Sequence, residues 1–155
     1  MNFEEILYEK KEGVARVTIN RPEKYNACTS RTLMELHQAL TDAWVDTGIG
    51  VVVFTGAGEK AFCTGGDQSI RDKGGYAGTI AALPVEVAWQ TVSNLIRTIP
   101  KPVIARVNGY AVGGGNVFQV VCDISIAAES AKLGQAGPKV GSFDPGYGTG
   151  DLVRC

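Results

Sequence analysis

The sequence predicts an α/β domain in which an opening hairpin is followed by strands that pair largely in parallel. Short apolar segments of strand type alternate with segments of helical periodicity. In addition, two glycine-rich turns each join an apolar strand-like run to a helix-like segment. The chain has 155 residues, of which 45% are hydrophobic and 20% charged. That length and composition predict a single domain over residues 1–155.

The first predicted elements are a β-hairpin and an amphipathic helix. Residues 6–10 and 14–20 are strand-like, and Gly13 between them suits a tight turn between antiparallel strands. Over residues 30–46 apolar side chains recur at helical spacing, and residues 29–30 offer a cap for the first turn. We therefore expect the hairpin and the helix to open the fold.

The remaining elements alternate between strands and helices. From their apolar patterns we predict a strand covered on both faces at 51–54, a helix from 84 to 99, a strand at 103–107, a short helix at 117–122 and a buried strand at 124–128. Glycines and charges between 71 and 82 predict a mobile surface loop that could act as a lid. The strand, glycine turn and helix occur twice, which suggests a superhelical repeat.

The charge balance and the cysteines exclude several classes of protein. A net charge of −1 provides no broad cationic surface for nucleic acid. No apolar stretch is long enough to span a bilayer, and the start of the chain lacks the features of a secretion signal, so we expect a cytoplasmic protein without a membrane partner. The four cysteines lie far apart with no C-x-x-C spacing, which predicts reduced, packing cysteines and no metal site.

The two glycine-rich turns, at residues 63–67 and 113–116, carry the main functional signal. Main-chain N–H groups in such turns can bind negative charge that develops on an oxygen, because preorganised amides in a dry site need little reorganisation. The sequence therefore predicts a pair of amides aimed at one oxygen. The alternative is that these glycines only permit tight turns.

Five motifs, in the same order, resemble the enoyl-CoA hydratase (crotonase) superfamily, and they cover essentially the whole chain. They lie at residues 20–27, 61–67, 101–105, 108–115 and 134–135. The resemblance implies a superhelix of repeated ββα units that binds an acyl-CoA thioester. It also implies that the two amides that polarise the thioester carbonyl are those of Gly66 and Gly114.

By the same resemblance, Lys24, Ala27, Asp67 and Gln68 fall where the family holds the bent CoA, partly through main-chain atoms. CoA enters as part of the substrate, so no separate cofactor is expected. Lys24 is equally consistent with a solvated lysine. Asp67 also suits the first turn of a helix, where a carboxylate interacts favourably with the helix dipole.

The residues at two positions decide which branch of the family the chain resembles. Hydratases place one glutamate shortly after the triple glycine and another after the Gly-Gln pair, but this chain has Asn116-Val117 and Ala136-Gly137 there. Without those carboxylates we do not expect simple hydration. Residues 65–68 and 137–144 resemble the branch of 2-ketocyclohexanecarboxyl-CoA hydrolase and 1,4-dihydroxy-2-naphthoyl-CoA synthase, and residues 144–149 are more similar to the hydrolase.

The hydrolase chemistry assigns roles to several polar residues. Asp144 is the expected base or proton shuttle, although it could be only a turn residue, and Ser142 would orient it or bind the keto oxygen. Tyr147 and Tyr76 are weaker candidates for the proton donor, with Tyr76 also near the expected ligand. In the alternative, the ring-closing synthase, Gly137 lies where some synthases bind bicarbonate.

The family's chains are longer than this one, and the resemblance implies that a helical C-terminal region is absent here. That region mediates trimer contacts and covers the acyl pocket. A third reading is therefore a catalytically poor acyl-CoA-binding or assembly subunit, protected by assembly. The resemblance implies a homo-oligomer, either a trimer or a dimer of trimers. His37, the sole histidine, is expected at the surface or in an interface.

Overall fold

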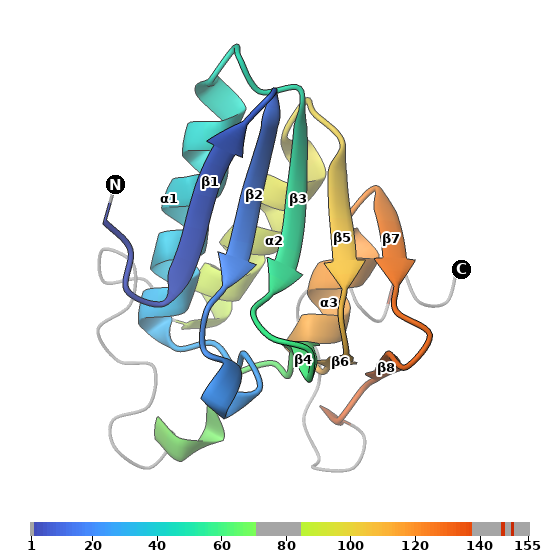
Figure 1. The fold of residues 1–155 in the computed structure, drawn as a ribbon. Helices are drawn as coiled ribbons and strands as arrows, with labels where there is room; N and C mark the ends of the chain where they lie inside the picture. The colour runs from blue at the N-terminus through green and yellow to red at the C-terminus, as the bar shows by residue number, and fades with distance from the viewer. Residues whose placement is uncertain (1, 71–84, 138–146, 148–149, 151–155) are drawn as a thin grey trace.

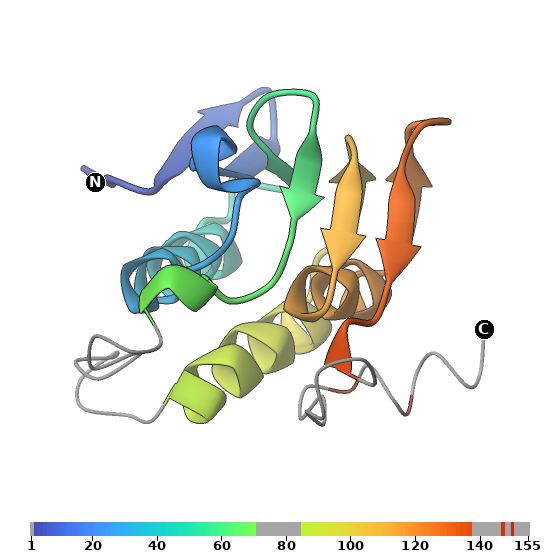
Figure 2. The same cartoon turned by 90° about the horizontal axis from the view of Figure 1, so that it is seen from below.

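The computed structural model describes residues 2–70, 85–137, 147 and 150 (Figure 1). A five-stranded sheet has the order β1-β2-β3-β5-β7, and three helices lie on one of its faces (Figure 2). Its strands are β1 (Ile6–Lys11), β2 (Val14–Ile19), β3 (Val51–Gly56), β5 (Val103–Val107) and β7 (Ile124–Ala127). The helices are α1 (Ser30–Val45), α2 (Val85–Thr98) and α3 (Gly114–Val121).

The strand pairing confirms the predicted α/β fold class. β1 and β2 form an antiparallel hairpin, and β2–β3, β3–β5 and β5–β7 pair in parallel. In the hairpin turn, Glu12 has φ 52° and Gly13 has φ 80°. Two successive positive φ angles match the twist of the flanking strands, which is why a glycine is favoured there. Thr29 caps α1, as expected, by accepting hydrogen bonds from the N–H groups of Arg31 and Thr32.

A second, smaller sheet lies below the first, in the order β4-β6-β8 (Figure 1). Its strands are β4 (Ala61–Cys63), β6 (Tyr110–Val112) and β8 (Lys132–Gly134), and both pairings are parallel. Two 3-10 helices, η1 (Pro22–Lys24) and η2 (Gln68–Ile70), lie near this end of the fold. The small sheet positions the glycine turns, because β4 leads into the first and β6 into the second.

The hydrophobic core fills the space between the large sheet and the helices. Its fully buried large side chains include Phe54, Phe62, Phe118, Leu33, Leu36, Leu40, Ile96 and Val92. Aromatic edges meet inside it, with ring centroids of Phe54 and Phe62 5.2 Å apart. Within the described residues, every helix is too short or too polar to span a bilayer.

Two predicted strands are less covered than expected. In β3, Val52 and Phe54 are fully buried, but Val51 and Val53 stay partly exposed, because the helices lie on one face only. The prediction of a buried strand at 124–128 is wrong. β7 is the edge strand of the sheet, and all four of its residues are exposed.

The predicted short helix begins earlier than expected, at Gly114 instead of Val117. Glycine disfavours a helix interior, so propensity pointed to a later start. Packing requires a glycine inside this first turn, because a Cβ on Gly115 would lie 1.9 Å from the carbonyl oxygen of Cys63. Only a residue without a side chain lets α3 approach β4 this closely.

Candidate functional site

The two glycine turns are in direct contact. Gly65, which follows β4 and has φ +86°, lies against the turn that begins α3. A Cβ on Gly65 would be 3.2 Å from the nitrogen of Gly114 and 3.3 Å from the carbonyl oxygen of Val112. Because β4 and β6 run parallel as neighbours, the turns that follow them emerge at the same edge.

The nitrogens of Gly66 and Gly114 therefore lie at the same edge of the small sheet. Standard bond lengths, added to the contact at Gly65, put the two nitrogens within about 7 Å of each other. An oxygen that accepts hydrogen bonds of about 2.9 Å from both needs nitrogens no more than about 6 Å apart. Gly114 is the first residue of α3, where an N–H has no acceptor within the helix. The geometry is compatible with the predicted pair of donors, whose role stays a prediction.

The first glycine turn is held in place by the segment before α1. The N–H of Cys28 donates to the carbonyl of Gly65 at 2.8 Å, and the N–H of Asp67 donates to the carbonyl of Cys28 at 2.9 Å. From the other side, the N–H of Gly65 donates to the sulfur of Cys63 at 3.4 Å. These bonds fix the main chain on both sides of Gly66.

The Asp67 side chain is buried, and its carboxylate accepts hydrogen bonds from other residues of the protein. Arg21 donates from Nη2 to one carboxylate oxygen at 2.9 Å, and Ser69 donates to the other from its N–H and its hydroxyl, at 3.0 and 2.6 Å. Burial alone would raise the pKa of Asp67, but the hydrogen bonds from Ser69 and Arg21 outweigh it and hold the pKa below its usual value. These contacts support a structural role for the carboxylate.

The other residues expected to hold CoA lie on the same rim. Lys24 ends η1 and is exposed, and its carbonyl accepts from the N–H of Ala27 at 3.0 Å. Ala27 is buried, and its carbonyl accepts a short hydrogen bond from Arg21. Gln68 is exposed and donates to the carbonyl of Gly66 at 3.1 Å. Gln68 thus contacts Gly66 directly, Ala27 precedes Cys28, which pairs with Gly66, and Lys24 is bonded to Ala27.

The structure describes only some of the predicted catalytic and ligand-binding residues. Asp144, Ser142 and Tyr76 lie outside the described residues. Tyr147 contacts α2: its hydroxyl donates to Asn94 Oδ1 at 2.5 Å, and its ring lies 4.6 Å from the Arg97 guanidinium. Gly137, at the end of a described segment, is partly buried.

The start of α3 has no acidic side chain in its first turn. Asn116 is 3% exposed, and its Oδ1 accepts from the Gln119 amide at 3.0 Å. Val117 is also buried. The first position where a hydratase was expected to carry a glutamate therefore holds a hydrogen-bonded amide followed by an apolar side chain, and the second holds Ala136 and Gly137.

Trp89 is a site residue that sequence reasoning missed. A Cβ on Gly114 would lie 2.7 Å from a carbon of the Trp89 ring, so the indole covers one side of that glycine. The same ring stacks on Phe118, with centroids 4.7 Å apart and planes inclined by 26°. The sequence offered one signal, an aromatic residue near the start of a predicted helix, but nothing in its spacing indicated Gly114.

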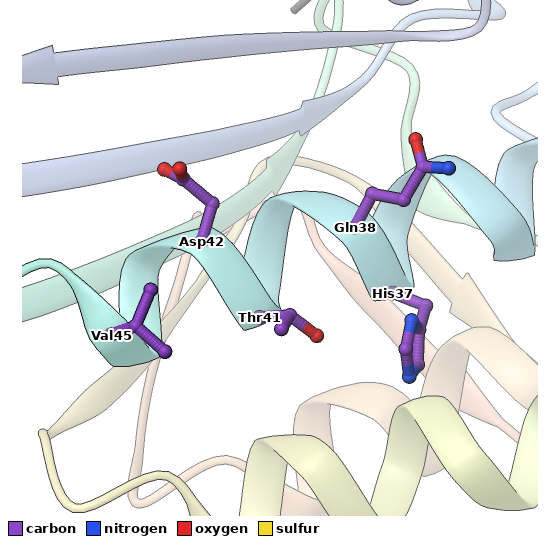
Figure 3. Close-up of a pocket in the computed structure, with 5 residues that line it drawn as sticks. All are labelled: His37, Gln38, Thr41, Asp42 and Val45. Carbon is purple, nitrogen blue, oxygen red and sulfur yellow. The ribbon is translucent and has the colours of Figure 1, made fainter.

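A hollow of about 580 Å³ lies along α1 (Figure 3). It is lined by His37, Gln38, Thr41, Asp42 and Val45. Figure 3 shows His37 and Thr41 on the side of α1 that faces α2, with Gln38 and Asp42 on the opposite side. His37 is half-buried beside this hollow, and its expected place at the surface or in an interface stays a prediction.

Comparison with known proteins supports the assignment of this fold. The sequence model of the family described as enoyl-CoA hydratase/isomerase matches residues 9–155. An enoyl-CoA hydratase/isomerase from Xanthobacter autotrophicus Py2 is similar, with 33% identity and a TM-score of 0.85 over 93% of this chain and 53% of that one. An enoyl-CoA hydratase from Bacillus anthracis gives 32% identity and a TM-score of 0.86 over 97% of this chain and 58% of that one.

The chain thus has a crotonase-like α/β fold and spans little more than half the length of these solved structures. Both solved structures match nearly all of this chain at sequence identities of 33% and 32%. The family model covers all but the first eight residues. The chain belongs to the enoyl-CoA hydratase/isomerase (crotonase) family.

Proposed function

We propose that this chain is the acyl-CoA-binding core of a hydrolase that cleaves a ring C–C bond in a cyclic β-keto acyl-CoA of the 2-ketocyclohexanecarboxyl-CoA type. The observation that carries the proposal is the contact between the turns at Gly65 and Gly114. This contact supports a pair of main-chain donors, the N–H groups of Gly66 and Gly114. Gly114 begins α3, where the helix dipole also favours a negatively charged oxygen.

The proposed reaction needs such a pair of donors. A base removes a proton from water, and the resulting hydroxide adds to the ring ketone. Collapse of the adduct forms a carboxylic acid and breaks the bond to the α-carbon, whose electron pair becomes a thioester enolate. The N–H groups of Gly66 and Gly114 would stabilise the enolate oxygen before the α-carbon takes up a proton. Each donor of this kind contributes about 3 kcal/mol, or about a hundredfold in rate.

Residues at the start of α3 favour this reaction over hydration. Water addition across a double bond requires a general acid and a general base near the α- and β-carbons. Asn116 is engaged by Gln119, and Val117 has no titratable group. Ala136 and Gly137, where the second glutamate was expected, have none either, so these positions supply neither the acid nor the base. The carbanion chemistry demands only one base, and the oxyanion donors provide the remaining stabilisation.

We assign the base or proton shuttle to Asp144, with Ser142 as its partner, on the sequence resemblance. Tyr147 is a weaker candidate, because its described contacts are with Asn94 and Arg97 on α2. Lys24, Ala27 and Gln68 are proposed to contact CoA at the rim of the site, largely through main-chain atoms. An assembly of three chains, or of two such trimers, is proposed from the family alone.

The direct experiment offers 2-ketocyclohexanecarboxyl-CoA and o-succinylbenzoyl-CoA separately and identifies the products by mass spectrometry. Ring opening of the first ester supports the proposal. In that case Asp144→Asn should abolish turnover and keep the affinity for the CoA ester within severalfold. Ring closure of the second instead indicates a synthase, for which Gly137 would lie at a bicarbonate site. Binding of both esters without turnover indicates an acyl-CoA-binding or assembly subunit.

A further inference from the structure

We propose that Trp89 forms the wall of the acyl site beside Gly114 and selects CoA esters whose acyl group carries a ring. The inference deepens the proposed function and rests on it, because it assumes that a thioester oxygen binds the Gly114 N–H. It assigns a specificity-determining side chain on α2, an element that carries neither glycine turn.

The first support is the closeness of the ring to the donor. Three carbons of the Trp89 six-membered ring lie 2.7, 2.8 and 3.2 Å from the position of a Cβ on Gly114. Standard geometry therefore places the Gly114 nitrogen within about 5 Å of the indole. The indole therefore lies beside this donor, where the acyl group of a bound thioester could contact it.

The second support is the way the ring is fixed. Trp89 stacks on Phe118, which is fully buried and meets the ring of Phe54 at 5.6 Å between centroids. Phe54 in turn contacts Phe62 at 5.2 Å. Trp89 is the partly exposed end of this aromatic row, whose other members lie in the core. A ring held in this way presents an apolar surface without losing side-chain entropy when a ligand binds.

The distances decide which acyl groups benefit. With the carbonyl oxygen about 2.9 Å from the Gly114 nitrogen, the carbonyl carbon and the α-carbon lie at the approach to the indole. A two-carbon acyl group ends there and contacts little of the ring. A six-membered ring on the α-carbon extends further and can pack on the indole, where apolar and aromatic contacts are favourable. We therefore expect selectivity for cyclic acyl groups.

The chain offers a built-in spectroscopic test, because it has two tryptophans. Trp44 lies on α1 and is 38% exposed, so Trp44→Phe leaves Trp89 as the single reporter and Trp89→Phe leaves Trp44. Titration with cyclohexanecarboxyl-CoA should change the Trp89 emission, whereas acetyl-CoA and free CoA should not. The variant that retains only Trp44 should respond to none of them.

Affinities provide the second readout. In equilibrium dialysis, Trp89→Ala should weaken the binding of cyclohexanecarboxyl-CoA and benzoyl-CoA by about tenfold or more. The affinities for acetyl-CoA and CoA should change by less than about threefold. Trp89→Phe keeps an aromatic contact with Phe118, so its affinity for the cyclic esters should lie between those of the unmodified protein and Trp89→Ala. This variant keeps the test valid if the alanine variant fails to fold. Trp44→Phe is the matched control and should leave every affinity unchanged.

The outcomes separate this inference from the function on which it rests. Two results would show that the assignment of Trp89 is wrong while the acyl-CoA proposal stands. In the first, all CoA esters bind and the Trp89 variants weaken the binding of each ester equally. In the second, the Trp89 emission does not change on titration with the cyclic esters. If the unmodified protein binds neither CoA nor any ester, the proposed function is contradicted, and the role of Trp89 is contradicted with it.

Discussion

The Arg21 guanidinium lies 2.9 Å from the Asp67 carboxylate and thereby joins the segment after β2 to the turn that carries Gly66. Both side chains are largely buried, with 14% and 6% of their surfaces exposed. The same guanidinium donates to the carbonyl of Ala27 and lies 3.4 Å from a carboxylate oxygen of Glu5. One cation thus connects three segments on the rim of the candidate site.

Removal of this cation should destabilise the protein strongly. Arg21→Met leaves the buried Asp67 carboxylate without its ion-pair partner, and loss of one member of a buried pair costs about 3–5 kcal/mol. Urea denaturation measures the change. Arg16→Met is the control, since Arg16 is 59% exposed and pairs only loosely with Glu9 at 3.8 Å, so its removal should cost under about 1 kcal/mol. Equal losses in the two variants would contradict a structural role for Arg21.

Asp67 should also give a recognisable dependence of stability on pH. Its pKa is lowered in the folded protein, against about 3.9 in an unfolded chain. The stabilisation from this group is therefore fully present above the unfolded pKa and is lost as the pH falls through the folded value. The difference in unfolding free energy between the unmodified protein and Asp67→Asn should be largest near neutral pH and shrink in acid. If this difference instead grows below pH ~4, the pKa of Asp67 is raised in the folded protein and the predicted direction of the shift is wrong.

Much of the large sheet could be predicted from the sequence, because its signals are local. The hairpin has its Glu12-Gly13 turn, and β3 and β5 are short β-branched runs. The small sheet could not be predicted, since β4, β6 and β8 have three residues each and exist only because their neighbours pair with them. The exposed β7 was mistaken for a buried strand because an apolar run does not reveal whether anything covers it.

The candidate site was predicted in part for the same reason. Glycine patterns identified both turns, but their contact depends on the parallel pairing of β4 with β6, which no local pattern encodes. Trp89 and Gly114 are distant in sequence and meet through the packing of α2 on α3. The hydrogen bond between Arg21 and Asp67 likewise joins residues that are 46 positions apart in the sequence.

Gly115 should tolerate no side chain. A Cβ there would lie 1.9 Å from the carbonyl oxygen and 2.5 Å from the carbonyl carbon of Cys63, which are main-chain atoms of β4 and cannot move aside alone. Gly115→Ala should therefore cost about 3 kcal/mol or more, or prevent folding. Gly134→Ala is the matched control, because nothing lies within 4 Å of its Cβ position, and it should change stability by less than about 0.5 kcal/mol. A native-like urea midpoint for Gly115→Ala would contradict the close approach.

The thiols of Cys28 and Cys63 should resist alkylation in the folded protein. Their sulfurs lie 3.7 Å apart and both residues are fully buried. Burial raises the pKa of Cys28, so little of the reactive thiolate is present. Iodoacetamide at pH ~8 should label both peptides rapidly in urea and slowly without it, as peptide mass spectrometry can measure. Equally fast labelling under both conditions would show that this region opens readily.

The N–H of Gly114 can be removed with a matched control for the Cβ that the change introduces. Gly114 is the first residue of α3, a position that accepts proline because its N–H has no partner within the helix. Gly114→Pro therefore deletes the donor, and Gly114→Ala introduces the same Cβ against Trp89 but keeps the N–H. If this amide stabilises the enolate, kcat of the proline variant should fall about a hundredfold or more below that of the alanine variant. Circular dichroism would verify that both variants fold. Equal kcat values in two folded variants would mean that the Gly114 N–H does not act on the reacting oxygen, and the contact between the turns would then be only a packing feature.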